Sequence, residues 1–219
     1  MTEVGSGGWP EASGLGPLVK VCGIRSVADA RMCVDLGVDA IGLNFWPGTK
    51  RRVEVEEAAR IVLAVGAQIA TVGLFVDEER ETIEQIKREV GFSWVQLHGR
   101  ESPDDVEALG HQAYKALRVG AVPVDAEAVR YPGALLLLDA LVPGEVGGTG
   151  RRFDWSLAKA LAQTRPIVLA GGLTPDNVAR AALAVKPRAV DVASGVESEP
   201  GVKDPRLVEA FVAAARVAV

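Results

Sequence analysis

The sequence predicts an α/β fold, a closed (β/α)8 TIM barrel with an eight-stranded parallel sheet. Short β-branched apolar runs alternate with longer amphipathic stretches along most of the chain. This alternation is typical of parallel strands that are covered by helices. Eight such runs occur, and glycine and polar residues gather after the runs rather than before them. A doubly wound open sheet produces the same local pattern and is the alternative.

The elements follow from these patterns in chain order. Residues 1–17 lack hydrophobic periodicity and are expected to form a flexible tail. Residues 18–219 contain no internal linker and are expected to form a single barrel domain. The expected strands are Val19–Ile24, Ala40–Phe45, Ala70–Val76, Trp94–His98, Ala113–Val119, Ala134–Ala140, Pro166–Ala170 and Ala189–Ser194. The expected helices include Ser26–Leu36, Val55–Val65, Glu78–Val90, Asn177–Val185 and Pro205–Val217.

Composition excludes several classes of protein. The formal net charge is −5 and no long basic run occurs, so neither nucleic acid nor an anionic membrane surface is an expected partner. No apolar stretch approaches the roughly 20 residues that span a bilayer, and the N-terminus has no pattern of a secretion signal. Two cysteines do not make a disulfide framework, so we expect reduced thiols and a cytoplasmic location.

Cys22 is the first candidate catalytic residue, because it ends an apolar run and precedes a glycine. A small buried hydrophobe is the alternative interpretation of such a cysteine. Lys20 shares the face of Cys22 by strand alternation and needs a carboxylate partner if it is buried. Asp191 is expected to be that partner, because the eighth strand of a closed barrel neighbours the first. We expect the pair to favour the thiolate of Cys22, although a purely structural ion pair is the alternative.

Asp139 is the second candidate, because it directly follows four leucines at 135–138. A carboxylate there is costly to desolvate unless it has a partner or a function. It is expected on the same rim as Cys22, where the two would form an acid and a base. A turn-capping aspartate is the alternative.

Two further features lie on the same rim. His98 ends the fourth run. It is either a site residue or a hydrogen-bonded structural histidine. Lys50, Arg51 and Arg52 form a short basic cluster after the second run. Such a cluster is usually solvated surface, but a local positive patch in an acidic protein also suits an anionic substrate. Arg51 could bind a carboxylate through two parallel hydrogen bonds.

Glycines follow the last three runs, at Gly147-Gly148, Gly171-Gly172 and Ser194-Gly195. Glycine lets backbone N–H groups approach a phosphate closely, and barrels of this class often bind phosphate after strands seven and eight. No Walker motif is present and no G-x-G-x-x-G follows the first run, so nucleotide binding lacks support. No metal site is expected, because the two histidines fall on different faces without ligand spacing.

Taken in order, six segments resemble one known family, the phosphoribosylanthranilate isomerases, which are (β/α)8 barrels. The likeness runs from about Leu18 to Val217, and the segments are Lys20–Ile24, Gly73–Val76, Val95–Gly99, Gly147–Gly150 with Phe153–Trp155, Leu169–Leu173 and Val190–Glu197. The match is looser around Arg51, where Arg52 replaces a residue that is often aromatic, so Lys50, Arg51 and Arg52 compete for one role.

The resemblance implies an Amadori rearrangement of N-(5-phosphoribosyl)anthranilate in tryptophan biosynthesis. It implies that Cys22 is the general base and Asp139 the general acid. No cofactor is implied, because the substrate nitrogen serves as the electron sink. The expected partner is this phosphorylated sugar–anthranilate, and the protein is expected to be a monomer or a homodimer. The expected substrate-binding residues are Arg51, His98, Gly147, Gly148, Gly171, Gly172, Asp191, Ser194 and Gly195.

Three other functions are alternatives. The related aldose–ketose isomerase of histidine biosynthesis, or an enzyme acting on both substrates, tends to use two aspartates, and Cys22 disfavours it. A sugar-phosphate epimerase or synthase would need a metal or a Schiff-base lysine at a strand end, and neither is evident. A non-catalytic phosphate-binding barrel is disfavoured by the intact pair of Cys22 and Asp139.

Overall fold

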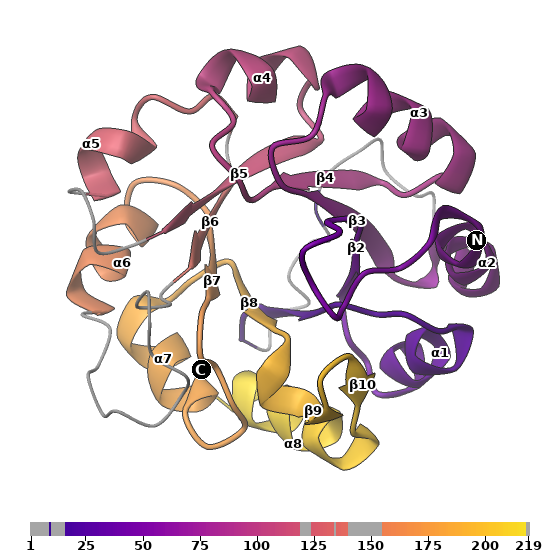
Figure 1. Cartoon of the computed structure of the whole chain (residues 1–219). Coiled ribbons are helices and arrows are strands. Elements are labelled where there is room, and N and C mark those ends of the chain that lie inside the picture. The colour runs from indigo at the N-terminus through magenta and orange to yellow at the C-terminus, as the bar shows by residue number, and fades with distance from the viewer. Residues whose placement is uncertain (1–8, 10–15, 119–123, 134, 140–154, 218–219) are drawn as a thin grey trace.

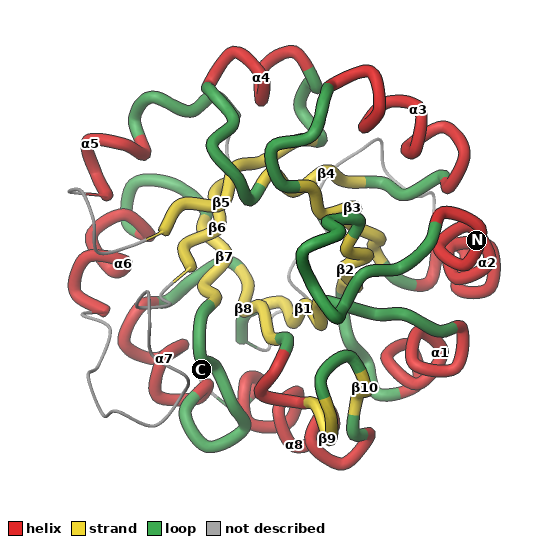
Figure 2. The backbone as a smooth tube through the Cα atoms, in the orientation of Figure 1, coloured by secondary structure: helices red, strands yellow, loops and turns green. Residues whose placement is uncertain are grey.

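The computed structural model contains a closed barrel of eight parallel strands, in which β1 pairs with β8 and strand order follows chain order. It describes residue 9 and residues 16–118, 124–133, 135–139 and 155–217. Figure 1 views the barrel along its axis, with the strands inside a ring of helices, and Figure 2 shows the same layers by element type. The predicted TIM barrel is therefore confirmed, and the open-sheet alternative is wrong.

The eight strands lie close to their predicted ranges. They are β1 Leu18–Cys22, β2 Ala40–Asn44, β3 Ala70–Phe75, β4 Trp94–Leu97, β5 Ala113–Arg118, β6 Leu136–Asp139, β7 Ile167–Ala170 and β8 Ala189–Val192. Among them, β1, β2, β3, β4 and β8 end one or two residues earlier than predicted. A small antiparallel hairpin, β9 Glu197–Glu199 with β10 Val202–Lys203, was not predicted.

The helices cover the outside of the barrel. They are α1 Val27–Asp35, α2 Val55–Val65, α3 Arg80–Val90, α4 Pro103–Ala108, α5 Val124–Ala128, α6 Trp155–Ala162, α7 Val178–Val185 and α8 Pro205–Arg216. Local capping fixes several of their ends. The Ser26 hydroxyl accepts from the backbone N–H of Asp29 at the start of α1, and Ser102 forms a capping box at the start of α4. Gly91 ends α3 in the left-handed conformation.

Among the described residues, two apolar cores follow from the alternation of side chains along each strand. In β1, Val19 and Val21 join the larger core, which also contains buried residues of the helices. Leu18 belongs to the second core, in the barrel interior. Lys20 and Cys22 share the face of Leu18 and thus point inward. Along the inward face of β1, the apolar Leu18 is therefore followed by Lys20 and then Cys22 toward the C-terminal end of the strand. The sequence predicted that Lys20 and Cys22 share this face.

The base of the barrel interior is aromatic. Trp94 of β4 and Tyr114 of β5 have ring centroids 6.4 Å apart. Trp9, which falls within the predicted tail, contacts both rings at centroid distances of 6.0 Å and 5.9 Å. These rings fill the barrel below the polar side chains, so the functional groups lie nearer the opposite end.

Candidate active site

A cavity of about 380 Å³ opens at the C-terminal ends of the strands. It brings together most of the residues that the sequence singled out, namely Cys22, Arg51, His98, Asp139, Gly171, Gly172, Asp191 and Ser194. A second hollow of about 470 Å³ lies beside α3 and α4, and none of the predicted site residues lines it. The cavity on the barrel axis is therefore the candidate active site.

Cys22 is the last residue of β1 and is 7% exposed. The backbone of Gly42 on β2 approaches the thiol closely, since a Cβ atom at Gly42 would lie 2.7 Å from Sγ. Burial raises the pKa of the Cys22 thiol, Lys20 opposes that rise, and the carboxylate of Asp191 adds to it. Lys20 thus acts in the predicted direction, toward the thiolate, although burial has the larger effect and leaves the pKa raised.

The predicted ion pair between Lys20 and Asp191 is confirmed. The two residues are register partners on β1 and β8, and Lys20 Nζ donates to Asp191 Oδ2 at 2.9 Å. The Lys20 side chain is fully buried. Burial alone would lower the pKa of Lys20, but the charge and hydrogen bond of Asp191, together with Cys22 and Tyr114, outweigh this effect and raise it. Lys20 is therefore an ammonium at neutral pH, directly below Cys22 on the inward face.

Asp139 ends β6, and it contacts His98, which follows β4 two strands away. Asp139 Oδ2 lies 3.2 Å from His98 Nε2. The other ring nitrogen, Nδ1, lies 3.0 Å from Nε2 of Gln96. The sequence predicted that a carboxylate behind four leucines needs a partner, and the imidazole supplies one. His98 is thus both hydrogen-bonded and a lining residue of the cavity.

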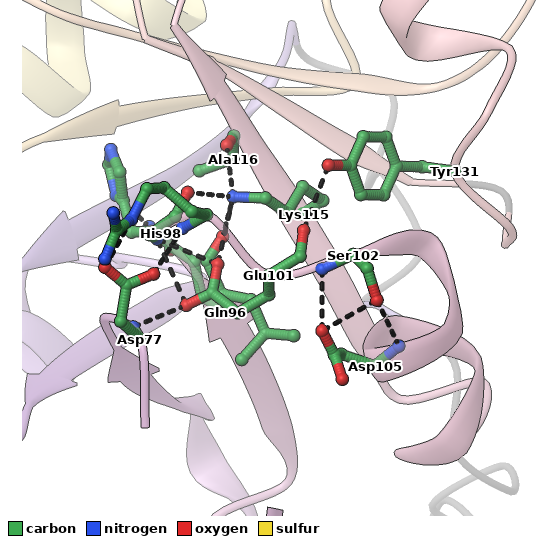
Figure 3. A network of polar contacts seen from close by, with 12 residues as sticks. Asp77, Gln96, His98, Glu101, Ser102, Asp105, Lys115, Ala116 and Tyr131 are labelled. Atoms are coloured by element: carbon green, nitrogen blue, oxygen red, sulfur yellow. Dashed lines mark hydrogen bonds and ion pairs between the residues drawn. The ribbon is translucent and has the colours of Figure 1, made fainter. Parts of the chain in front are cut away.

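A buried polar network fixes the turn that follows His98 (Figure 3). Lys115 of β5 donates to the carbonyl oxygens of Leu97 and Gly99 at 3.2 Å and 2.8 Å. Its ammonium also pairs with Glu101 at 3.1 Å. Glu101 accepts in turn from the backbone N–H groups of Gly99 and Asp77. Both charged side chains are nearly fully buried, so the network restrains the backbone on either side of His98.

Arg51 reaches the cavity from the loop after β2, and Glu197 holds it there. Arg51 Nε and Nη2 donate to the two carboxylate oxygens of Glu197 at 2.8 Å and 2.7 Å. Lys203 donates to Glu197 at 2.8 Å and to the carbonyl oxygen of Ala193 at 3.1 Å. The hydrogen bond from Arg51 works against burial and keeps the pKa of Glu197 below its ordinary value. One guanidinium edge is therefore bound by the protein itself.

The three residues of the basic cluster, Lys50, Arg51 and Arg52, differ in their contacts. Arg51 lines the cavity. Arg52 pairs with Glu54 at 3.2 Å, and both side chains are largely exposed. Lys50 is exposed as well. Of the three competing residues, Arg51 has the geometry that suits a ligand in the cavity.

The glycine loops after β7 and β8 meet at the cavity. Gly171 and Gly172 have φ angles of +90° and +62°, which L side chains rarely adopt. A Cβ atom at Gly195 would overlap the carbonyl oxygen of Leu173, so only glycine lets the two loops pack this closely. Gly147 and Gly148 lie outside the described residues.

Sequence reasoning missed several lining residues, namely Asn44, Trp46, Thr49, Gln96 and Arg118. Asn44 and Arg118 end β2 and β5, so their position at strand ends was the available signal. Trp46 is 40% exposed, and its backbone N–H donates to Asn44 Oδ1 at 2.9 Å. Among the described residues, no group of three or more histidine, cysteine, aspartate or glutamate side chains is placed to hold a metal ion.

Within the described parts of the chain, no helix is both long enough and apolar enough to cross a membrane.

Comparison with known proteins agrees with this geometry. The sequence model of N-(5'-phosphoribosyl)anthranilate isomerase matches residues 19–214. An N-(5'-phosphoribosyl)anthranilate isomerase of Desulforudis audaxviator is 45% identical over 204 residues, which cover 92% of this chain and 99% of the relative.

Solved structures agree as well. The phosphoribosylanthranilate isomerase of Thermotoga maritima superposes with a TM-score of 0.82 at 39% identity, covering 91% of this chain and 98% of the other. A phosphoribosylanthranilate isomerase in complex with reduced 1-(o-carboxyphenylamino)-1-deoxyribulose 5-phosphate superposes with a TM-score of 0.79 at 36% identity, covering 91% and 98%. With a matching barrel, a matching sequence and one cavity at the rim, this chain belongs to the N-(5'-phosphoribosyl)anthranilate isomerase family.

Proposed function

We propose that Cys22 and Asp139 are the general base and the general acid of the isomerisation that names this family. The substrate is N-(5'-phosphoribosyl)anthranilate, and the reaction is a step of tryptophan biosynthesis. The observation that carries the proposal is that both side chains line one cavity of about 380 Å³. They stand on β1 and β6, at the end of the barrel where such enzymes hold their reacting groups.

The chemistry is an Amadori rearrangement without net oxidation. Asp139 donates a proton to the furanose ring oxygen, the C1–O bond breaks, and the nitrogen lone pair forms a C1=N iminium ion. Cys22 removes the proton from C2, and that electron pair forms the C1=C2 bond of an enolamine while the iminium electrons return to nitrogen. Tautomerisation moves a proton to C1 and leaves the ketone. Acid and base steps supply roughly 10²–10⁴-fold each.

Substrate anchors follow from the chemistry of its two ends. Arg51 is proposed to bind the anthranilate carboxylate with the donors that Glu197 does not use. The backbone of Gly171-Gly172 and Ser194-Gly195 is proposed to bind the phosphate. Holding both ends would keep the pentose between the acid and the base.

The base in this scheme is the thiolate, although burial raises the pKa of Cys22. A raised pKa lowers the thiolate fraction and makes each thiolate a stronger base. Lys20 is proposed to limit that rise and so to keep the thiolate accessible. Asp191, in turn, holds Lys20 in its charged form.

The test is turnover of two variants, followed by the fluorescence of the anthranilate group. Cys22→Ser and Asp139→Asn are each expected to lose about 10²-fold or more of kcat, the lower bound for a general acid or base. Unchanged far-ultraviolet circular dichroism and melting temperature would show that both remain folded. Near-normal turnover in either variant would refute its role. Parallel assays with the riboside of histidine biosynthesis would reveal a dual-substrate enzyme.

We further propose that residues 18–219 act as one catalytic domain and that residues 1–17 are an appended segment. A cytoplasmic location is proposed from the two free cysteines and the biosynthetic reaction. The protein is proposed to act as a monomer or a homodimer, without nucleic acid or membrane partners.

A further inference from the structure

A chain of hydrogen-bonded side chains rises through the barrel interior to Asp139. It begins at Tyr114, whose hydroxyl donates to Gln96 Oε1 at 2.9 Å. Gln96 Nε2 lies 3.0 Å from His98 Nδ1, and His98 Nε2 lies 3.2 Å from Asp139 Oδ2. Tyr114 is fully buried and Gln96 is 1% exposed. Burying two polar side chains is costly unless each has hydrogen-bond partners. Neither residue has a part in the mechanism above.

The donors and acceptors of this chain specify one tautomer of His98. The oxygen of the Gln96 amide accepts from Tyr114, so the amide nitrogen is the group that faces Nδ1. An amide nitrogen only donates, so Nδ1 must be unprotonated. A neutral imidazole with an unprotonated Nδ1 carries its hydrogen on Nε2, and this N–H donates to Asp139 Oδ2.

That tautomer decides which oxygen of Asp139 carries the acid proton. The carbonyl oxygen of a neutral carboxyl is a better acceptor than its hydroxyl oxygen, so the hydrogen bond from His98 to Oδ2 favours the acid proton on Oδ1. With the opposite tautomer, Nε2 of His98 would accept, and the acid proton would be retained in a hydrogen bond from Oδ2 to the imidazole. Proton delivery to the substrate therefore depends on the hydrogen-bonding state of His98.

We propose that Tyr114 and Gln96 are positioning residues that hold His98 as a hydrogen-bond donor and thereby direct the acid proton of Asp139 toward the substrate. This inference rests on the proposed role of Asp139 as the general acid. It assigns a function to two buried residues outside the acid–base pair, one of which, Tyr114, does not line the cavity.

The surroundings of Tyr114 support this role. Its ring packs against Trp94 and Trp9 at centroid distances of 6.4 Å and 5.9 Å, within the aromatic layer at the base of the barrel. Burial raises the pKa of Tyr114, so the hydroxyl keeps the hydrogen that it donates. At the upper end, Lys115 and Glu101 restrain the turn after His98. The hydrogen-bonded series of side chains is thus supported near both of its ends.

Nitrogen-15 magnetic resonance of labelled histidine reads the tautomer directly. The sequence has two histidines, and His111 is exposed. In a His111→Gln background, the remaining histidine signals come from His98 only. Asp139→Asn is the informative further change, because its neutral amide imitates a protonated carboxyl and removes the charge that could itself select the tautomer. In this background His98 is expected to remain protonated at Nε2 and unprotonated at Nδ1.

Adding Tyr114→Phe to that background frees the Gln96 amide to turn, and the fraction of His98 protonated at Nδ1 is expected to rise. Two results would overturn the proposal. One is a mixed tautomer in the Asp139→Asn background alone, since the carboxylate charge would then be the determinant. The other is a His98 spectrum that Tyr114→Phe does not change.

Kinetics provide the second readout, in the protein with Asp139 intact. Tyr114→Phe and Gln96→Met are expected to lower kcat about tenfold, a fraction of the 10²–10⁴-fold that a general acid supplies, with KM nearly unchanged. Trp94→Phe is the matched control, because it perturbs the same aromatic layer without touching the hydrogen-bond chain, and its kcat is expected to stay near wild type. Full kcat in Tyr114→Phe and Gln96→Met, with Asp139→Asn inactive, would refute this inference alone. A fully active Asp139→Asn would instead refute the proposed function.

Discussion

Replacing Lys20 with methionine tests how the barrel interior controls the base. In the Lys20→Met variant, the charge that opposes burial at Cys22 is lost, so the pKa of the thiol should rise further. An opposite charge within a few ångströms shifts a pKa by about 1–3 units. Asp191 partly offsets the change, because it also loses its partner and becomes easier to protonate. We expect a net rise of about one unit, toward the lower end of that range.

Stability should change as well, and the structure gives the scale. The pair is 2.9 Å apart, with side-chain exposures of 0% and 8%. Removing one partner of such a pair costs about 3–5 kcal/mol, whereas removing both is often neutral or stabilising by about 1–4 kcal/mol. The double variant Lys20→Met/Asp191→Leu should therefore unfold at a higher urea concentration than Lys20→Met alone.

The sign of the pH dependence follows from Asp191. Without Lys20, burial holds the pKa of Asp191 above its unfolded value. A raised folded pKa gives stability that is present below the unfolded pKa and lost as pH rises through the folded value. The stability deficit of Lys20→Met should accordingly be smallest in acid.

The assay combines urea unfolding with ultraviolet titration of the thiolate. Burial raises the pKa of Cys33, the second cysteine, to about 12, so its thiol adds little signal below that range. A Cys33→Ala background removes it entirely. An unchanged or lowered Cys22 pKa in Lys20→Met would refute the reasoning, as would a double variant that is no more stable than the single one.

Three further outcomes are expected. Because burial raises the pKa of Cys22, the thiolate fraction is still growing as pH rises through neutrality. The value of kcat/KM should therefore keep rising with pH beyond the pKa of an ordinary thiol. A kcat/KM that reaches its plateau below neutral pH would contradict this prediction. In Gly42→Ala the new methyl group lies 2.7 Å from the Cys22 sulfur, so kcat should fall at least about tenfold. The control Gly73→Ala crowds the ring of Phe92 at 2.6 Å, so it should lose stability but keep its kcat. Equal kcat values in the two variants would contradict the account. Glu197→Gln removes the charge that orients Arg51, so KM should rise by about tenfold with little change in kcat; an unchanged KM would count against carboxylate binding there.

The sequence predicted the features that depend on strand periodicity. Buried parallel strands leave short β-branched runs, and those runs located all eight strands to within a few residues. Alternation placed Lys20 and Cys22 on one face, and closure of the barrel made Asp191 the neighbour of Lys20. These inferences needed only the period of a strand and the adjacency of the first and last strands.

Contacts between loops were beyond that reasoning. Arg51 and Glu197 are 146 residues apart and meet because the β9–β10 hairpin lies beside the loop after β2, which no local pattern indicates. The short helices α4 and α5 contain too few residues for a helical period to be visible. The link from Tyr114 through Gln96 to His98 depends on how side chains of neighbouring strands stack inside the barrel. Register, which the sequence does not show, determines that stacking.

The crystal structure of this protein bound to reduced 1-(o-carboxyphenylamino)-1-deoxyribulose 5-phosphate would test the central claim most directly. We expect C2 of the sugar about 3–3.5 Å from the Cys22 sulfur, with the Asp139 carboxyl at hydrogen-bond distance from O4 on the other side. A pentose that lies outside the space between these two side chains, or that contacts only one of them, would contradict it.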